Sequence, residues 1–205
     1  LALSTQRETH LPLVCFGLFA QVTECEPPTP LAPPVGPPWQ LDTEHQDYLA
    51  DIAEIRDLIA GGEVYQINHT LRLHNYIAEP WQHFCQMAVD APYAAFIETD
   101  EFAIVSASPE LFFRLQGNDL QSRPMKGTET RRANPAADKR IPDWLRASQK
   151  NRAENLMITD MVRNDLGKIA APGSIEVSEL FKVEEYPTVW QMTSTVRART
   201  DADLV

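Results

Sequence analysis

Apolar and polar positions alternate through the middle of the chain in the manner of β-strands. Residues 93–127 read as two strand-turn-strand units, whose turns fall at Glu98–Glu101 and Gly117–Asp119. Further strands are expected near residues 174–186 and 189–199. Because no helix separates the strands of 93–127, they should pair in antiparallel fashion. The pattern therefore predicts an α+β protein rather than a doubly wound one.

Three stretches have the spacing of amphipathic helices. Thr43 and Gln46 form a candidate capping box for the first, and Gly61-Gly62 should end it. The second helix is expected within residues 80–91 and the third within 148–168. The apolar face expected on the first consists of Tyr48, Leu49, Ile52, Ile55, Leu58 and Ile59. The core-facing residues expected on the third are Ala153, Leu156, Met157, Met161 and Val162.

The first 40 residues differ in character from the rest. Residues 10–22 are rich in branched and aromatic side chains and predict a buried strand or two. Residues 27–39 contain seven prolines, which remove amide donors and fix φ, so we expect an extended connector that acts as a spacer. The chain is accordingly divided into an N-terminal segment, 1–40, and a second unit, 41–205.

Two more segments complete the pattern. Residues 63–73 alternate like a strand, which would place Gln66 and Asn68 on one face. Residues 129–148 are polar and irregular, and predict a mobile loop that leads into the third helix.

Composition and charge exclude several classes of protein. The chain has 205 residues, of which 43% are hydrophobic and 23% charged, so global disorder is not expected. Its apolar runs are too short for a membrane span. The net charge of −11 argues against a role with nucleic acid or an anionic membrane, because both need a basic face. An anionic small substrate would need local cations or a metal.

Cysteine usage and the N-terminus favour a cytoplasmic protein. Cys15, Cys25 and Cys85 are odd in number and widely spaced, which predicts reduced thiols. Residues 1–16 lack a basic region followed by an apolar stretch, so no signal peptide is visible.

Three residues are candidates for chemistry, and each has an ordinary structural alternative. Lys126 precedes a glycine that would allow a ligand to approach the backbone, but most lysines are solvated surface charges. Glu110 follows Ser108-Pro109 and could simply belong to a turn. Glu154 could pair with Arg152, or could face a cavity and hold a cation, for which Mg²⁺ suits a single carboxylate better than Zn²⁺.

Four blocks of sequence resemble the chorismate-utilising enzymes, and most of all their aminodeoxychorismate-forming branch. They read "GEVYQINHTLRL", "SASPELFF", "SRPMKGTETR" and a long block from Lys150 to Val196. The resemblance extends from about residue 41 to residue 200. It implies an anthranilate synthase component I-like fold with large antiparallel sheets and packed helices, of which 41–205 would be the N-terminal part.

The resemblance implies roles for particular residues. Lys126 would be the nucleophile of the aminodeoxychorismate branch. The related anthranilate, isochorismate and salicylate synthases typically have alanine there, so this residue would separate the branches. Glu110 would be the general acid, and Glu154 a ligand of Mg²⁺. Gly127 and Thr128 would form the turn that presents amide donors to the substrate. Gln66 would stand where the water-adding members have a lysine base, and glutamine cannot serve as that base.

The implied reaction converts chorismate and ammonia to 4-amino-4-deoxychorismate, for para-aminobenzoate and folate biosynthesis, through a lysine adduct at C2. A glutamine amidotransferase subunit or domain would deliver the ammonia. The alternatives are anthranilate synthase component I and a chorismate-binding fragment without catalysis.

The sequence departs from the family pattern at three places. Asn151 stands where an acidic residue is common, and Gln191 stands where many relatives have histidine. Val205 precedes the family's later blocks, so we expect a fragment with little or no activity alone.

Overall fold

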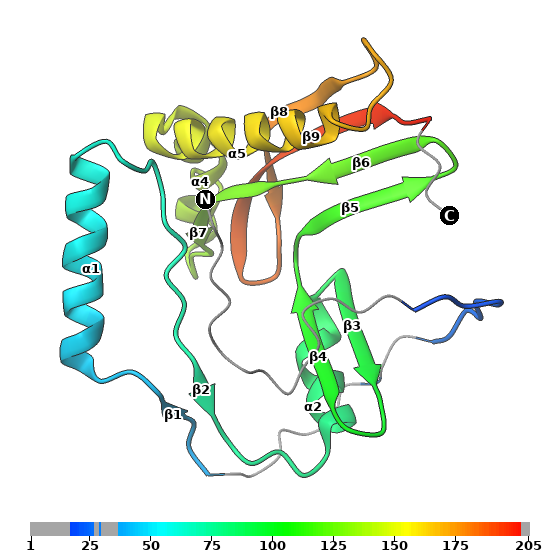
Figure 1. Ribbon diagram of the computed structural model, residues 1–205. Helices are drawn as coiled ribbons and strands as arrows, with labels where there is room; N and C mark the ends of the chain where they lie inside the picture. The colour runs from blue at the N-terminus through cyan, green and yellow to red at the C-terminus, as the bar shows by residue number, and fades with distance from the viewer. Residues whose placement is uncertain (1–16, 27–28, 30–36, 202–205) are drawn as a thin grey trace.

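The larger of the sheets is built around its last strand. The computed structural model describes residues 17–26, 29 and 37–201. β9 (Val189–Arg199) pairs with β8 (Glu176–Glu185) along one edge, and with β6 (Asp119–Arg123) and β7 (Met125–Thr130) in succession along the other. β5 (Leu111–Gln116) adds to β6, and every pair is antiparallel. Figure 1 shows this sheet in the upper part of the molecule.

A proline separates the two strands that share one edge of β9. Pro124 lies between β6 and β7 and has no amide hydrogen to give to a ladder. Its carbonyl oxygen accepts from the Ser194 amide at 3.1 Å, so the edge of β9 stays bonded across the junction. The alternation of β9 then sends Met192 and Ser194 to one face, and Thr193 and Thr195 to the other.

Three helices follow β7 along the chain, and two of them cover the Met192 face of the sheet. They are α3 (Pro135–Asp138), α4 (Ile141–Ala147) and α5 (Gln149–Gly167). The Ser148 hydroxyl begins α5 by accepting from the Asn151 amide at 3.3 Å. Ile141 and Leu145 of α4 pack with Met192 in the core, against Phe181, Val183 and Trp190.

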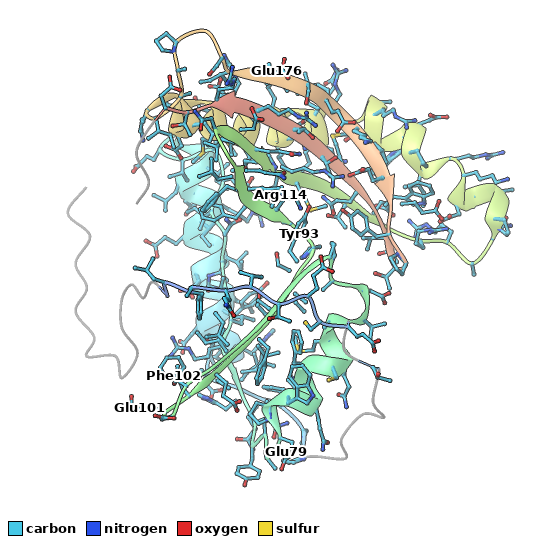
Figure 2. The ribbon with its side chains drawn as sticks, turned by 90° about the vertical axis from the view of Figure 1, so that its right-hand side faces the viewer. Glu79, Tyr93, Glu101, Phe102, Arg114 and Glu176 are labelled. Atoms are coloured by element: carbon cyan, nitrogen blue, oxygen red, sulfur yellow. The ribbon has the colours of Figure 1, made fainter. Side chains whose placement is uncertain are left out.

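A second, smaller layer lies apart from this core. The hairpin of β3 (Tyr93–Glu98) and β4 (Ala103–Ser108) packs against α2 (Pro80–Met87), which a 3₁₀ turn at Ala88–Asp90 extends. An aromatic cluster of Trp81, Phe84 and Phe96 joins helix and hairpin, with ring centroids 5.1–5.6 Å apart. In Figure 2 the hairpin tip at Glu101 and Phe102 points away from the large sheet, which carries Arg114 and Glu176.

The remaining elements stand at the side of the molecule. α1 (His45–Ala60) has no buried residue, and a short pair of strands, β1 (Gln40–Leu41) with β2 (Leu73–His74), lies near its base (Figure 1). Gly61 ends α1 by donating to the Asp57 carbonyl at 2.8 Å, and Gly62 takes φ +74°. Among the described residues no helix is long and apolar enough to cross a membrane.

The structure confirms the α+β class and the antiparallel pairing of residues 93–123. The helix predictions for 80–91 and 148–168 are also confirmed, and the first helix lies where it was expected. The prediction for 129–148 was wrong, because α3 and α4 fold there, held by the Asn134 side chain, which accepts from two amides at the start of α3. The capping box was wrong too, since α1 begins after Glu44 without a side-chain cap.

Two strand predictions also fail. Residues 63–72 lie outside any ladder and bend at Glu63 and Tyr65. Only Leu73 and His74 pair, with Leu41 and Gln40 of the two-residue strand β1. Residues 17–22 form no strand and Leu18, Phe19 and Val22 are exposed, while 10–16 and most of 27–39 lie outside the described residues. The division at residue 40 stays a prediction.

Candidate functional site

Lys126 lies in a β-bulge. β7 and β9 pair at Met125 with Thr193 and again at Thr128 with Gln191, so Lys126 and Gly127 together face the single residue Met192. A bulge breaks the ladder and leaves the extra backbone groups without strand partners. The half-buried Lys126 is therefore presented at a kink in the strand.

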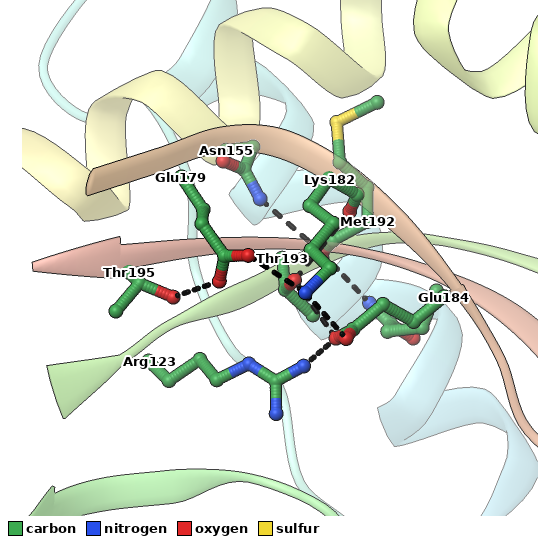
Figure 3. A network of polar contacts seen from close by, with 9 residues as sticks. Arg123, Asn155, Glu179, Lys182, Glu184, Met192, Thr193 and Thr195 are labelled. Atoms are coloured by element: carbon green, nitrogen blue, oxygen red, sulfur yellow. Dashed lines mark hydrogen bonds and ion pairs between the residues drawn. The ribbon is translucent and has the colours of Figure 1, made fainter. Parts of the chain in front are cut away.

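A buried asparagine of α5 occupies the gap that the bulge opens. Asn155 is 0% exposed, and its Nδ2 donates to the Lys126 carbonyl at 3.2 Å and to the Met192 carbonyl at 3.3 Å. Its Oδ1 accepts from the Ser194 hydroxyl. Figure 3 shows Asn155 reaching from the helix toward Met192.

Glu110 reaches the same bulge from the turn between β4 and β5. Its Oε1 accepts from the Met125 amide at 2.8 Å, directly before Lys126. Ser108 fixes the turn, because its hydroxyl lies 3.2 Å from both the amide and the carbonyl oxygen of Glu110. The Glu110 carboxylate thus binds the backbone amide of the residue that precedes Lys126, the other predicted catalytic residue.

Gly127 and Thr128 complete the bulge. Gly127 has φ +96°, and a Cβ at this position would lie 3.2 Å from the Cβ atoms of both Asn151 and Met192. Helix and strand can approach this closely only because the residue is glycine. The Thr128 hydroxyl donates to Gln191 Oε1 at 2.6 Å, so Gln191 is engaged by a predicted binding residue.

Glu154 lies at a second place, in a cavity along α5. Glu154 lines a cavity of about 560 Å³ together with Tyr65, Ala153, Leu156, Met157 and Asp160. Gln66 follows Tyr65 in the chain, and its Nε2 donates to Asn68 Oδ1 at 3.0 Å, while its buried Oε1 has no hydrogen-bond partner among the described residues. The two places are joined through α5, because Asn151 packs against Gly127 and Glu154 lies three residues further along.

The residues at the Glu154 cavity supply only some of the ligands that a divalent cation needs. Glu154 makes one weak ion pair, with Lys150 at 3.9 Å, so its oxygens remain available. Over the described residues, no group of three or more His, Cys, Asp or Glu side chains is placed to hold a metal. One carboxylate fits Mg²⁺ when water and substrate oxygens fill the other positions.

A charged cluster secures the chain just beyond the site. Arg131 follows β7, donates from Nε to Asp138 Oδ2 at 2.9 Å, and stacks over the Trp190 ring at 5.0 Å. The hydrogen bond from Arg131 lowers the pKa of Asp138 below its ordinary value, and the Arg132 amide, which donates to Oδ1 at 2.7 Å, lowers it further. The same Asp138 hydrogen bond raises the pKa of Arg131.

The sheet face opposite α5 carries a second polar network, drawn in Figure 3. Lys182 bridges Glu179 at 2.7 Å and Glu184 at 3.4 Å, and Arg123 pairs with Glu184. The hydrogen bond from Lys182 is the main reason that the pKa of Glu179 is lowered. These contacts tie β8 to β6 and β9 behind the bulge.

The buried face of α5 is not the one that its apolar residues predict. Ala153, Leu156 and Met161 were expected to meet the core, but all three are exposed. The fully buried positions are the polar residues Asn155 and Thr159. The signal was present as Asn151, Asn155 and Thr159 at four-residue spacing, which puts them on one face of a helix. A search for apolar positions alone overlooks such a face.

Comparison with known proteins gives the family. The family described as chorismate binding enzyme matches residues 5–205. Aminodeoxychorismate synthase component 1 of Klebsiella aerogenes is 43% identical over 169 residues, 81% of this chain and 38% of that protein. The Escherichia coli K12 protein of the same name is 39% identical over 78% of this chain and 36% of its own length. Anthranilate synthase component 1 of Streptomyces coelicolor is 33% identical over 78% and 32%.

Solved structures show the same fold. Anthranilate synthase component I from Streptococcus pneumoniae superposes with a TM-score of 0.72 at 23% identity, over 82% of this chain and 37% of that one. A putative 2,3-dihydroxybenzoate-specific isochorismate synthase from Bacillus anthracis gives 0.69 at 20% identity, over 84% and 48%. The chain spans well under half the length of the named relatives it matches. Its fold and sequence place the chain in the family of chorismate-binding enzymes.

Proposed function

We propose that this chain is part of a chorismate-aminating enzyme that forms 4-amino-4-deoxychorismate from chorismate and ammonia. The observation that carries the proposal is the bulge of β7, where Lys126 stands beside the Met125 amide held by Glu110. A displacement of this kind needs an amine that attacks and a carboxylic acid that protonates the leaving group, and Lys126 and Glu110 are residues of these two types.

In the proposed reaction the neutral Lys126 amine attacks C2 of chorismate. The C2–N bond forms, the double bonds of the ring shift, and the C4–O bond breaks. Glu110 gives its proton to the departing hydroxyl, which leaves as water. Ammonia then attacks C4, the double bonds shift back, and the C2–N bond breaks to return the lysine amine after proton transfer.

The position of Glu110 favours one of its oxygens for the proton transfer. Oε1 already accepts from the Met125 amide at 2.8 Å. Oε2 is therefore the oxygen that would carry the proton to the leaving hydroxyl. The Ser108 contacts hold the backbone of Glu110, so the carboxyl group approaches from a fixed direction.

Glu154 is the residue of this chain that we propose for Mg²⁺. The ion would neutralise a substrate carboxylate, which matters in a chain of net charge −11. Glu154 would supply one oxygen ligand from the cavity that it lines with Tyr65.

The choice of the amination branch rests on Lys126 and on the relatives. Two of the compared relatives bear the name aminodeoxychorismate synthase component 1, and a third is an anthranilate synthase. "Component 1" implies a partner, for which we propose a glutamine amidotransferase subunit or domain that supplies ammonia.

Lys126→Ala in the full gene product tests the proposal. With chorismate, ammonium and Mg²⁺, we expect aminodeoxychorismate from the unaltered protein and a loss of more than about 1,000-fold in the variant, measured by mass spectrometry, because the nucleophile is gone. Lys168→Ala is the matched control, because its side chain is 67% exposed and pairs with Asp165 at the end of α5. Formation of anthranilate by the unaltered protein, or full activity in Lys126→Ala, would contradict the proposal.

A further inference from the structure

We propose that Asn155 is a positioning residue for Lys126: it closes the bulge of β7 and thereby fixes where the lysine amine is presented. The inference rests on the proposed function for its catalytic consequence. It assigns a role to a side chain that was not among the predicted site residues.

The side chain of Asn155 supplies the hydrogen-bond donors that the bulge of β7 lacks. Two residues of β7 face Met192 alone, so the carbonyls of Lys126 and Met192 cannot both find ladder partners there. An asparagine amide has two hydrogens to donate. Asn155 gives them to these two carbonyls, at 3.2 Å and 3.3 Å.

The orientation of the Asn155 side-chain amide is determined by its neighbours. The Phe181 amide donates to Ser194 Oγ at 3.2 Å, so the hydroxyl hydrogen is free to point at Asn155 Oδ1. Oδ1 must therefore face Ser194, and Nδ2 must face the two carbonyls. The Thr159 hydroxyl holds the backbone below by donating to the Asn155 carbonyl at 2.6 Å.

The two hydrogen bonds that Asn155 donates, here called the clamp, affect where the Lys126 amine lies. Lys126 has a long flexible side chain, so the place of its amine depends on where its backbone is held. The peptide before it is held by Glu110 through the Met125 amide, and the peptide after it by Asn155 through the Lys126 carbonyl. Gly127 packs against Asn151 and Met192 and leaves the turn no room to move toward the helix. The backbone on both sides of Lys126 is thus held in place, and displacement of a catalytic group by about 1 Å can cost about 100-fold in rate.

The test is Asn155→Asp in the full gene product. The new carboxylate has the same shape but turns an acceptor toward two carbonyl oxygens. We expect kcat for chorismate amination to fall about 100-fold while the KM for chorismate stays unchanged, because Asn155 contacts the nucleophile's backbone and not the substrate.

The matched control is Thr195→Val. Thr195 is 1% exposed on the same strand as Ser194, and its hydroxyl bonds to Glu179 at 3.0 Å, away from Lys126. It loses a buried hydrogen bond without touching the bulge, so kcat should stay at the unaltered level in folded protein. Equal kcat for folded Asn155→Asp and Thr195→Val would overturn the inference and leave the proposed function standing.

Two further measurements make every outcome informative. If Asn155→Asp does not fold, Ser194→Ala removes the hydroxyl that orients the amide, and unaltered kcat in that variant would overturn the inference. If the unaltered protein makes no aminodeoxychorismate, the proposed function fails, and the clamp is tested by acetylation of Lys126 relative to Lys150. That ratio should change in Ser194→Ala and stay constant in Thr195→Val; a constant ratio in both overturns the clamp.

Discussion

The bulge of β7 and the stretch after α1 both belong to blocks that resemble the same enzyme family, yet they are built in opposite ways. Around Lys126 the backbone is held by Glu110 and Asn155, and a glycine lets the helix approach. Between Gly61 and Leu73 the chain is mostly exposed and has no strand partner except at its end. Stretches that carry the family's motifs can thus have either a tightly held backbone or an exposed one without strand partners.

The backbone of this protein is fixed where its amides and carbonyls have partners. A strand needs a neighbour to satisfy its amides and carbonyls, and residues 63–72 have no strand beside them in the described part of the chain. β7 has β9, and where the bulge interrupts the ladder a side chain of α5 takes over. The predictions that follow test whether the packed region carries most of the stability.

The largest difference is expected between two leucines. Leu145→Ala removes a side chain that is 0% exposed and packs against Ile141 and Met192, so the free energy of unfolding should fall by about 3–5 kcal/mol. Leu58→Ala, on the half-exposed face of α1, should cost about 1 kcal/mol. Urea unfolding of both variants measures the two losses. Equal losses would show that α1 belongs to the same packed core.

Gly127 in the bulge and Gly62 after α1 should differ in the same direction when each is replaced by alanine. Gly127→Ala forces a side chain into φ +96° and to within 3.2 Å of Asn151 and Met192, which should cost about 2–4 kcal/mol. Gly62→Ala also meets a positive φ, but nothing lies within 4 Å of the new methyl, so about 1 kcal/mol is expected. Thermal unfolding compares them, and a larger effect at Gly62 would refute the account.

The smallest expected effect is the pH dependence of the stability that Asp138 contributes. The pKa of Asp138 is lowered in the folded protein, so its contribution to stability is complete above the ordinary value of 3.8 and is lost as the pH falls through the lowered pKa. Asp138→Asn should therefore be less stable than the unaltered chain at neutral pH, and the two should converge under acid. Urea unfolding at a series of pH values measures this, with the exposed Asp143→Asn as control. A stability difference that does not shrink under acid would contradict the assignment.

Much of the fold follows from local pattern. The hairpins at Glu98–Glu101 and Gly117–Asp119 and the helix from Gln149 are predictable because turn residues and caps act over a few positions. The order of the large sheet is not, because the pairing of β9 with β6, β7 and β8 depends on residues far apart in sequence. The strand expected at 63–73 failed for the same reason, because an alternating pattern does not show whether a neighbouring strand is present to pair with it.

The site shows the same division. Lys126 and Glu110 are recognisable from motifs, and in the structure the Glu110 carboxylate binds the amide of Met125, the residue before Lys126. Asn155 could not be chosen, because a buried polar residue is recognised by the carbonyls it satisfies, and those appear only once the bulge exists. The catalytic and metal-binding roles themselves stay predictions.

The central place of β9 has a consequence for the order of events on the ribosome. β6 and β7 lie end to end, and the strand that bridges them, Val189–Arg199, is synthesised only after α5 and β8. Until it emerges, these edges have no partner, and long-range pairing of this kind is slow. The nascent chain must hold open strand edges for that interval, which is when edge-to-edge association with other chains competes with folding.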